Sequence, residues 1–268
     1  MLKLLRCAGR RRSFEAGESP PSTIAPILAS LIVIGAWELF ARFGGLPSYL
    51  LPAPSAVIIE IVREKELLAS HAWATLVESV LGLVTACVIG IGLAMIIVLF
   101  RSLGDAIYPL LVVSQVVPKV ALAPLMIIYV GFGLQSKILM VFLLAFFPIV
   151  VNTIMGLRSI STDLLQLLET MKASKWQIMW QIRMPNAIPQ MVEGTKIAVT
   201  LAVTGALVGE FASGNEGLGY LVLASSANLN TLLSFAAILI LAVLGIVLFE
   251  CVKIIGNIVT PKPLRSQS

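Results

Sequence analysis

Six long apolar runs follow one another along the chain, separated by more polar stretches. They cover residues 24–43, 72–100, 107–130, 138–157, 197–211 and 232–255. The fifth is the shortest and is expected to extend to 193–212. A helix needs roughly 20 apolar residues to cross a bilayer, whereas a barrel strand needs about ten of alternating polarity. Because only helices satisfy their backbone hydrogen bonds in lipid at these lengths, the pattern predicts an all-α polytopic membrane protein with about six transmembrane helices.

An amphipathic segment separates the first two apolar runs. Pro52 and Pro54 interrupt the chain, and residues 56–68 then place apolar side chains such as Val57 and Ile61 at helical spacing against charged ones. This spacing is typical of a helix that lies on a membrane surface. We expect a connector resting on the outer face of the membrane, in preference to a docking surface for a partner.

The composition is that of a chain that resides in lipid. Of its 268 residues, 58% are hydrophobic and 12% are charged, whereas a soluble domain carries about a quarter charged residues. The three cysteines have no CxxC spacing and His71 is the sole histidine, which argues against a metal site, a disulfide framework or a cofactor bound by this chain. The basic residues are scattered instead of forming one patch, so no nucleic-acid partner is expected.

The distribution of basic residues indicates the orientation. With a cytoplasmic N-terminus, 14 of the 19 Lys and Arg residues fall on the inner side. By the positive-inside rule both termini are then cytoplasmic. The expected organisation is a basic tail at 1–23, a transmembrane domain at 24–255 and a second tail at 256–268. A twin-arginine export signal at Arg11 and Arg12 is the alternative, but five further spans argue against it.

Residues 158–196 form a long polar loop between the fourth and fifth runs. Its first part has an apolar helical face made of Leu164, Leu165, Leu167, Leu168 and Met171. Ser174 and Gln177 have the spacing of a capping box, which predicts a second short helix. Pro185 is expected to end that helix, because proline disfavours the helical conformation at the preceding Met184. The result would be a helix–turn–helix that projects into the cytoplasm.

The same loop carries more apolar side chains than a solvated connector needs, among them Trp176 and Trp180. Aromatic side chains of this kind are typical of interface hot spots. Packing against the cytoplasmic ends of the chain's own helices is the alternative for some of them. We favour a partner-binding role for this face.

Three segments of the loop resemble a known motif. Residues 173–178 (ASKWQI), 182–185 (IRMP) and 187–189 (AIP) are similar to the EAA loop of ABC importer permeases. Other similar segments lie at 117–125, 131–133, 147–158, 209–211 and 217–220. The resemblance covers about residues 52–253. It is to the branch that handles nitrate, sulfonates, taurine, pyrimidine vitamin precursors and riboflavin.

The resemblance implies the type I ABC importer permease fold in a bacterial inner membrane. It also implies the partners, which are a second permease copy, two ATPase subunits that bind ATP and Mg²⁺, and an extracytoplasmic substrate-binding protein. In the family this loop carries the coupling helix, which inserts into a groove on the ATPase. The loop residues expected to take part are Leu165, Gln166, Leu168, Glu169, Met171, Lys172, Ser174, Trp176, Trp180 and Pro185.

The start of the motif departs from the family pattern. The Glu-Ala-Ala of the family falls on residues 166–168 (QLL), and its glycine falls on Lys172. Glu169, one turn later, is a candidate substitute for the missing acid. The departure shifts the expected ATPase contact from a carboxylate toward the apolar face around Leu168 and Met171.

Polar and proline residues within the apolar runs mark a candidate translocation path. Prolines there free backbone carbonyls, which are tolerated next to protein or a water-filled path, although kinks that only shape packing are equally compatible. Intramembrane charges need a partner or a wet cavity, so Lys119 and Glu210 are expected either to pair or to line the path. The candidate path residues are Gln115, Pro118, Lys119, Asn152, Thr204 and Glu210.

These features predict a permease subunit that moves a small polar nutrient and hydrolyses nothing itself. No G-x-x-x-x-G-K-[ST] segment is present to bind nucleotide phosphates. An ion-gradient-driven secondary transporter is the main alternative, but it predicts related halves and leaves the long loop unexplained. An intramembrane enzyme would need clustered catalytic residues, and no Ser/His or paired-carboxylate constellation stands out.

Overall fold

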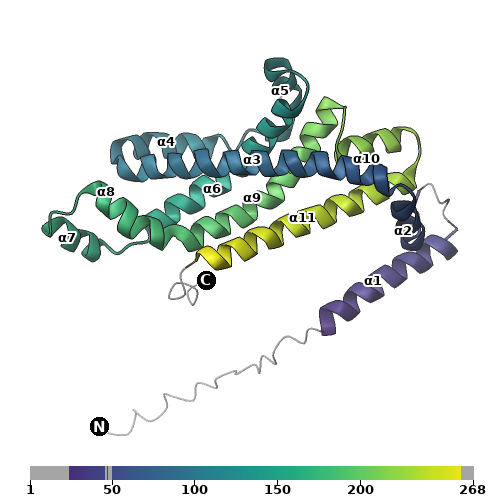
Figure 1. The fold of residues 1–268 in the computed structure, drawn as a ribbon, viewed down its shortest axis with the longest axis horizontal. Helices are drawn as coiled ribbons and strands as arrows, with labels where there is room; N and C mark the ends of the chain where they lie inside the picture. The colour runs from purple at the N-terminus through teal and green to yellow at the C-terminus, as the bar shows by residue number, and fades with distance from the viewer. Residues whose placement is uncertain (1–23, 46, 48–49, 261–268) are drawn as a thin grey trace, which may run out of the picture.

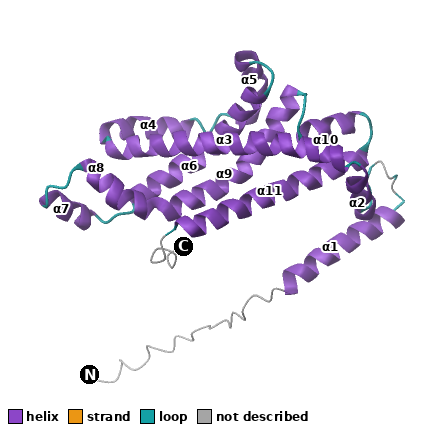
Figure 2. Cartoon of the chain, viewed as in Figure 1, coloured by secondary structure: helices purple, strands orange, loops and turns teal. Residues whose placement is uncertain are grey.

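The computed structural model describes residues 24–45, 47 and 50–260, and every regular element within them is a helix (Figure 2). The predicted all-α class is confirmed. The basic tail at 1–23, with Arg11 and Arg12, and the end of the second tail at 261–268 lie outside the described residues. The expected domain boundaries and the cytoplasmic placement of both termini therefore stay predictions.

Four helical segments of the described chain are long and apolar enough to cross a membrane, and they lie side by side (Figure 1). They are α3 (Lys65–Leu99), α6 (Leu134–Arg158), the continuous segment Lys175–Ser213 and α11 (Thr231–Val259). Helix α6 packs against both α3 and the third segment. Buried residues such as Leu83, Ala145 and Ala202 come from these three helices and form one apolar core.

Small residues let α9 (Met184–Ser213) approach α6 at backbone distance. Gly205 of α9 is buried, and a Cβ atom built on it would lie 2.7 Å from the Cα of Val141 on α6. No side chain fits in that gap without moving one of the two helices. The contact between α6 and α9 therefore depends on the absence of a side chain at Gly205.

The helix that precedes the bundle, α1 (Ile24–Phe43), lies apart from the long helices beside α2 (Pro54–Arg63) (Figure 1). Its Glu38 accepts hydrogen bonds from the backbone N–H of Ser55 at 3.0 Å and from the Ser55 hydroxyl at 2.7 Å. The Trp37 ring lies 6.0 Å from that of Phe235 on α11. Helix α1 is thus attached to the rest of the chain at its C-terminal end.

The prediction of one amphipathic helix over residues 56–68 is wrong at the C-terminal end of that range. Helix α2 ends at Arg63, and the bend at Glu64 (φ −100°, ψ 26°) begins α3 at once. This bend lets Val57 of α2 and Leu68 of α3 enter the same buried apolar cluster.

The third apolar run at 107–130 is not one span. It divides into α4 (Arg101–Val113), the 3₁₀ turn η1 (Lys119–Leu122) and α5 (Ala123–Val130), and α5 stands away from the bundle in Figure 1. The break falls before Pro118, which is extended (φ −68°, ψ 97°). Proline has no N–H to continue the helical ladder and restricts the residue before it.

Pro185 does not end a helix, contrary to the prediction. Helix α8 (Lys175–Ile178) continues through a π-helical turn, η2 (Met179–Arg183), into α9. Met184 is helical (φ −63°, ψ −50°), and its N–H bonds to the carbonyl of Met179, five residues back. Because proline has no N–H to place in an α-helical ladder, the wider turn accommodates Pro185.

The ten-residue helix α10 (Leu218–Ala227) was not predicted. It lies between α9 and α11 at the end of the bundle opposite α7 (Thr162–Thr170) (Figure 1). Below, the two ends are called the α7 end and the α10 end.

Candidate functional site

The turn between α7 and α8 is held by local hydrogen bonds. The predicted capping box is present, since the Gln177 N–H donates to Ser174 Oγ at 3.2 Å and the Ser174 N–H donates to Gln177 Oε1 at 2.8 Å. At the end of α7, the Ala173 N–H donates to the Leu168 carbonyl at 3.0 Å and the Lys172 N–H to that of Glu169 at 2.9 Å. These two bonds form a Schellman motif.

Lys172 occupies the left-handed position of this motif, with φ +59°. A left-handed conformation costs a residue with a side chain roughly 1–2 kcal/mol, and glycine is the favoured residue there. It is also the position at which the family pattern has its glycine. The Schellman turn therefore forms here with a lysine.

Lys172→Gly is expected to stabilise the α7–α8 turn by about 0.5–1 kcal/mol, because it removes this strain and loses part of the gain to the greater freedom of the unfolded chain. Hydrogen exchange at the amides of residues 172 and 173 measures the effect. Lys175→Gly is the matched control in the first turn of α8, where glycine should destabilise by about 1 kcal/mol. Changes of the same sign in both variants would contradict the prediction.

The apolar residues of the loop divide into a buried and an exposed set. Met179 is 1% exposed and packs with Leu157 and Ala187 at the α7 end of the bundle. Trp176 and Trp180 are 57% and 55% exposed, and their ring centroids lie 6.3 Å apart. The remaining loop candidates are half-buried (Leu165, Leu168) or exposed (Gln166, Glu169, Met171, Lys172, Ser174, Pro185).

Two path candidates meet across the break in the third apolar run. The Lys119 ammonium donates to Gln115 Oε1 at 3.0 Å and lies 5.6 Å from the centroid of the Phe147 ring on α6. Gln115 and Pro118 are exposed, and Lys119 is half-buried. The bend thus presents a cation and an amide together at the surface of the chain.

The other path candidates divide between the surface and the interior. Thr204 is exposed on α9 and donates to the Thr200 carbonyl at 3.0 Å, while Asn152 is half-buried and donates to the Pro148 carbonyl at 2.8 Å. Glu210 is 0% exposed. The predicted alternative that Lys119 and Glu210 form a pair is wrong, because each has other partners.

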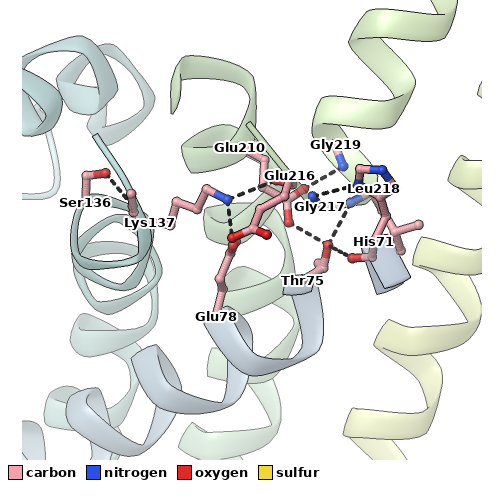
Figure 3. Close-up of polar contacts among 11 residues, drawn as sticks. His71, Thr75, Glu78, Ser136, Lys137, Glu210, Glu216, Gly217, Leu218 and Gly219 are labelled. Atoms are coloured by element: carbon pink, nitrogen blue, oxygen red, sulfur yellow. Dashed lines mark hydrogen bonds and ion pairs between the residues drawn. The ribbon is translucent and has the colours of Figure 1, made fainter. Parts of the chain in front are cut away.

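A buried ion pair lies near the α10 end of the bundle. Lys137 on α6 and Glu78 on α3 are each 1% exposed, and the Lys137 ammonium donates to Glu78 Oε1 at 2.7 Å. The same ammonium donates to the backbone carbonyl of Glu216 at 2.9 Å, in the turn before α10 (Figure 3). The pair therefore connects α3, α6 and this turn.

Side chains of α3 and α9 cap the N-terminus of α10 (Figure 3). The Gly217 N–H donates to His71 Nδ1 at 3.0 Å, and the Leu218 N–H donates to Thr75 Oγ1 at 2.8 Å. The Gly219 N–H donates to Glu210 Oε2 at 2.5 Å, and the Thr75 hydroxyl lies 2.5 Å from Glu210 Oε1. The cap therefore satisfies three successive amides that a helix N-terminus leaves without partners.

We call this set the α10 clamp, made of His71, Thr75, Glu78, Lys137 and Glu210. Gly217 has φ +109°, and a Cβ atom on it would overlap the Glu210 carboxyl group, so only glycine fits beneath the clamp.

Of the clamp residues, only Glu210 was a candidate from the sequence, and His71, Thr75, Glu78 and Lys137 were missed. Lys137 falls just before the fourth apolar run. The available signal for it was the need of the intramembrane Glu210 for a cation at similar depth. Among the described residues, no group of three or more His, Cys, Asp or Glu side chains is placed to hold a metal ion.

Comparisons with known proteins identify similar chains over most of this length. The model of the family described as "Binding-protein-dependent transport system inner membrane component" matches residues 86–264. The formylaminopyrimidine transport permease protein ThiX of Halalkalibacterium halodurans is 38% identical, over 94% of this chain and 98% of its own. The riboflavin transport system permease protein RibX of Chloroflexus aurantiacus is 34% identical, over 92% of each chain.

A solved structure has the same fold. A chain of the MetNI methionine ABC transporter, in an inward-facing conformation, matches with a TM-score of 0.65 at 21% identity. The match covers 74% of this chain and 99% of that one.

Proposed function

The chain belongs to the family of binding-protein-dependent transport system inner membrane components and is the permease subunit of an ATP-driven importer, and from this premise we propose that residues 158–196 couple it to an ATPase subunit. The observation that carries the proposal is the exposed pair Trp176 and Trp180 at the capped start of a long helical segment. Aromatic side chains held rigidly and exposed to solvent favour burial against a partner.

The structure of the loop and its connection to α9 support the coupling role. The pair lies at the start of a 39-residue helical segment that continues into the bundle without a loop. A force applied to docked tryptophans would therefore act directly on α9. The missing motif acid leaves the ATPase contact to the apolar side chains, among them Met171, which is 71% exposed at the C-terminal end of α7. ATP and Mg²⁺ bind to the ATPase and not to this chain, which has no P-loop.

The complete importer would contain two permeases, two ATPases and an extracytoplasmic binding protein. We place the exposed Gln115, Pro118 and Thr204, with the half-buried Lys119 and Asn152, on the path between two identical permeases. Glu210 belongs instead to the α10 clamp. The loop would face the cytoplasm of a bacterial cell, as the positive-inside rule predicts.

The substrate class that fits best is a polar nitrogen heterocycle of the vitamin or vitamin-precursor kind. The names of ThiX and RibX refer to formylaminopyrimidine and riboflavin, and both relatives match nearly the whole chain. The Lys119 ammonium and the Gln115 amide can supply hydrogen bonds to the carbonyl and ring-nitrogen acceptors of such a compound.

Co-purification with the ATPase tests the coupling role. The double variant Trp176→Ala/Trp180→Ala is expected to recover at least tenfold less ATPase than the wild-type chain and to lose ATP-driven uptake, because truncating an aromatic hot spot costs about 2 kcal/mol or more. Trp73→Ala is the matched control, since Trp73 is 66% exposed on α3 away from the loop. Equal recovery of ATPase with all three chains would refute the role of the tryptophan pair.

A further inference from the structure

The α10 clamp contains two carboxyl groups and one ammonium group in a site closed to solvent. Glu78, Lys137 and Glu210 are at most 1% exposed. If both carboxyls were ionised, the site would hold an uncompensated negative charge. An unpaired buried charge is strongly unfavourable, and two close carboxyls relieve it by sharing a proton.

No other described group balances this charge. On α3, His71 uses Nδ1 as an acceptor for Gly217, which requires that nitrogen to be unprotonated, and its ring lies against Tyr220 of α10 with the centroids 5.9 Å apart. Lys137 is the cation on α6, and Glu210 is the acid on α9. In the turn before α10, the Glu216 side chain is exposed, and its backbone carbonyl is the group that faces the site.

Hydrogen bonding distinguishes the two acids. Both oxygens of Glu210 have a donor within reach, one of them the N–H of Gly219 at the N-terminus of α10. A helix N-terminus favours a negative charge, so this environment suits an ionised carboxylate. Glu78 differs, because its Oε1 accepts from Lys137 while its Oε2 is buried without a hydrogen-bonding partner.

The second oxygen of Glu78, Oε2, faces a group that could serve as its hydrogen-bonding partner. Figure 3 shows the carboxyl groups of Glu78 and Glu210 side by side next to Lys137. A hydrogen on Glu78 Oε2 would turn an unpartnered acceptor into a donor toward an ionised Glu210. The site would then be neutral, with Lys137 positive and Glu210 negative.

We propose that Glu78 is a proton-binding site, loaded while α10 is docked on the clamp. Docking of α10 brings the Gly219 N–H and the Glu216 carbonyl into register with Glu210 and Lys137 and closes the site around Glu78. Undocking admits water, which lets Glu78 ionise. Docking therefore takes up one proton, and a rise in pH weakens it. This inference rests on the clamp alone and not on the coupling role of residues 158–196.

Infrared difference spectroscopy of the full-length chain in lipid vesicles tests the proton directly. The wild-type chain is expected to show the carbonyl band of a protonated carboxyl at neutral pH, shifted in deuterium oxide. Glu78→Gln should lose the band. Glu193→Gln is the control, because the exposed Glu193 on α9 pairs with the half-buried Lys196, and this substitution should leave the band unchanged. A wild-type spectrum without such a band, or a band that survives in Glu78→Gln, would overturn the proposal.

Thermal unfolding assigns the proton to one of the two acids. Glutamine has the shape and the hydrogen-bonding pattern of a protonated glutamate, so Glu78→Gln should unfold within about 2 °C of the wild-type chain. Glu210→Gln removes the charge that caps α10 and should lower Tm by about 5 °C or more. An equal loss in both variants, or a larger loss in Glu78→Gln, would reject Glu78 as the site. The wild-type infrared band decides the question if either variant fails to fold.

Discussion

Lys137→Met is expected to lower the free energy of unfolding by about 3–5 kcal/mol. Methionine has nearly the length of lysine but leaves the Glu78 and Glu210 carboxyls without a cation in a site that solvent does not reach. It also removes the donor of the Glu216 carbonyl in the turn before α10. Chemical unfolding of the purified chain in mild detergent, followed by tryptophan fluorescence, measures the loss.

Two further variants make this result specific to the buried charge. Lys196→Met breaks the partly exposed pair with Glu193 and should cost no more than about 1 kcal/mol. The double variant Lys137→Met/Glu210→Gln removes one charge of each sign and is expected to be more stable than Lys137→Met alone. If the two substitutions simply add, shape and not charge explains the effect, and the role of Lys137 as counter-ion is wrong.

Gly205→Leu is the second substitution with a large expected effect, a destabilisation of about 3 kcal/mol together with a loss of uptake of more than tenfold. The new Cβ would lie 2.7 Å from the Cα of Val141, so α6 and α9 must separate along their main contact. The obstruction is a backbone atom, which cannot rotate away as a side chain does. Thermal unfolding and substrate uptake by reconstituted importer measure the two effects.

Gly92→Leu is the matched control for this substitution. Gly92 lies within α3, and a Cβ atom added to it would meet no other atom within 4 Å, so leucine there should be tolerated to within about 0.5 kcal/mol. Comparable destabilisation by both variants would show that loss of glycine in a membrane helix, and not helix separation, is responsible.

Local patterns in the sequence predicted the features whose causes are also local. The apolar runs at 138–157 and 232–255 became α6 and α11 with a few added residues. The capping box at Ser174 formed as its spacing predicted, because the two side chains satisfy amides only three residues apart. For the same reason the amphipathic face of α7 was readable from the chain.

Two prolines show where local reasoning stops. Pro118 breaks the third apolar run, whereas Pro185 is absorbed by a π turn and the helix continues. The chemistry of the residue is the same in both cases. The difference is packing, because the helix at Pro185 has a buried Met179 and Ala187 on either side of it, and the residues before Pro118 are exposed. Sequence spacing alone carries no information on that difference.

The α10 clamp could not be predicted from the sequence, for a related reason. Its members come from three helices, and the Glu78–Lys137 and Thr75–Glu210 contacts join residues 59 and 135 positions apart. The sequence marks Glu210 as an intramembrane charge that needs a partner or a wet cavity, but it does not tell which cation Glu210 meets. The contact between Gln115 and Lys119, by contrast, joins residues only four positions apart, although the helix is broken between them.

The uninterrupted segment Lys175–Ser213 carries Trp176 near one end and Glu210 near the other. Its 39 residues are about 58 Å long, so a rotation of only about 5° around the midpoint displaces the two ends by about 2.5 Å in opposite directions. Hydrogen bonds of the clamp tolerate much less than that. Any such rotation imposed at the tryptophans must therefore either move α10 together with α9 or release α10 from the clamp. Movement at one end of the segment is thus coupled to the contacts at the other end.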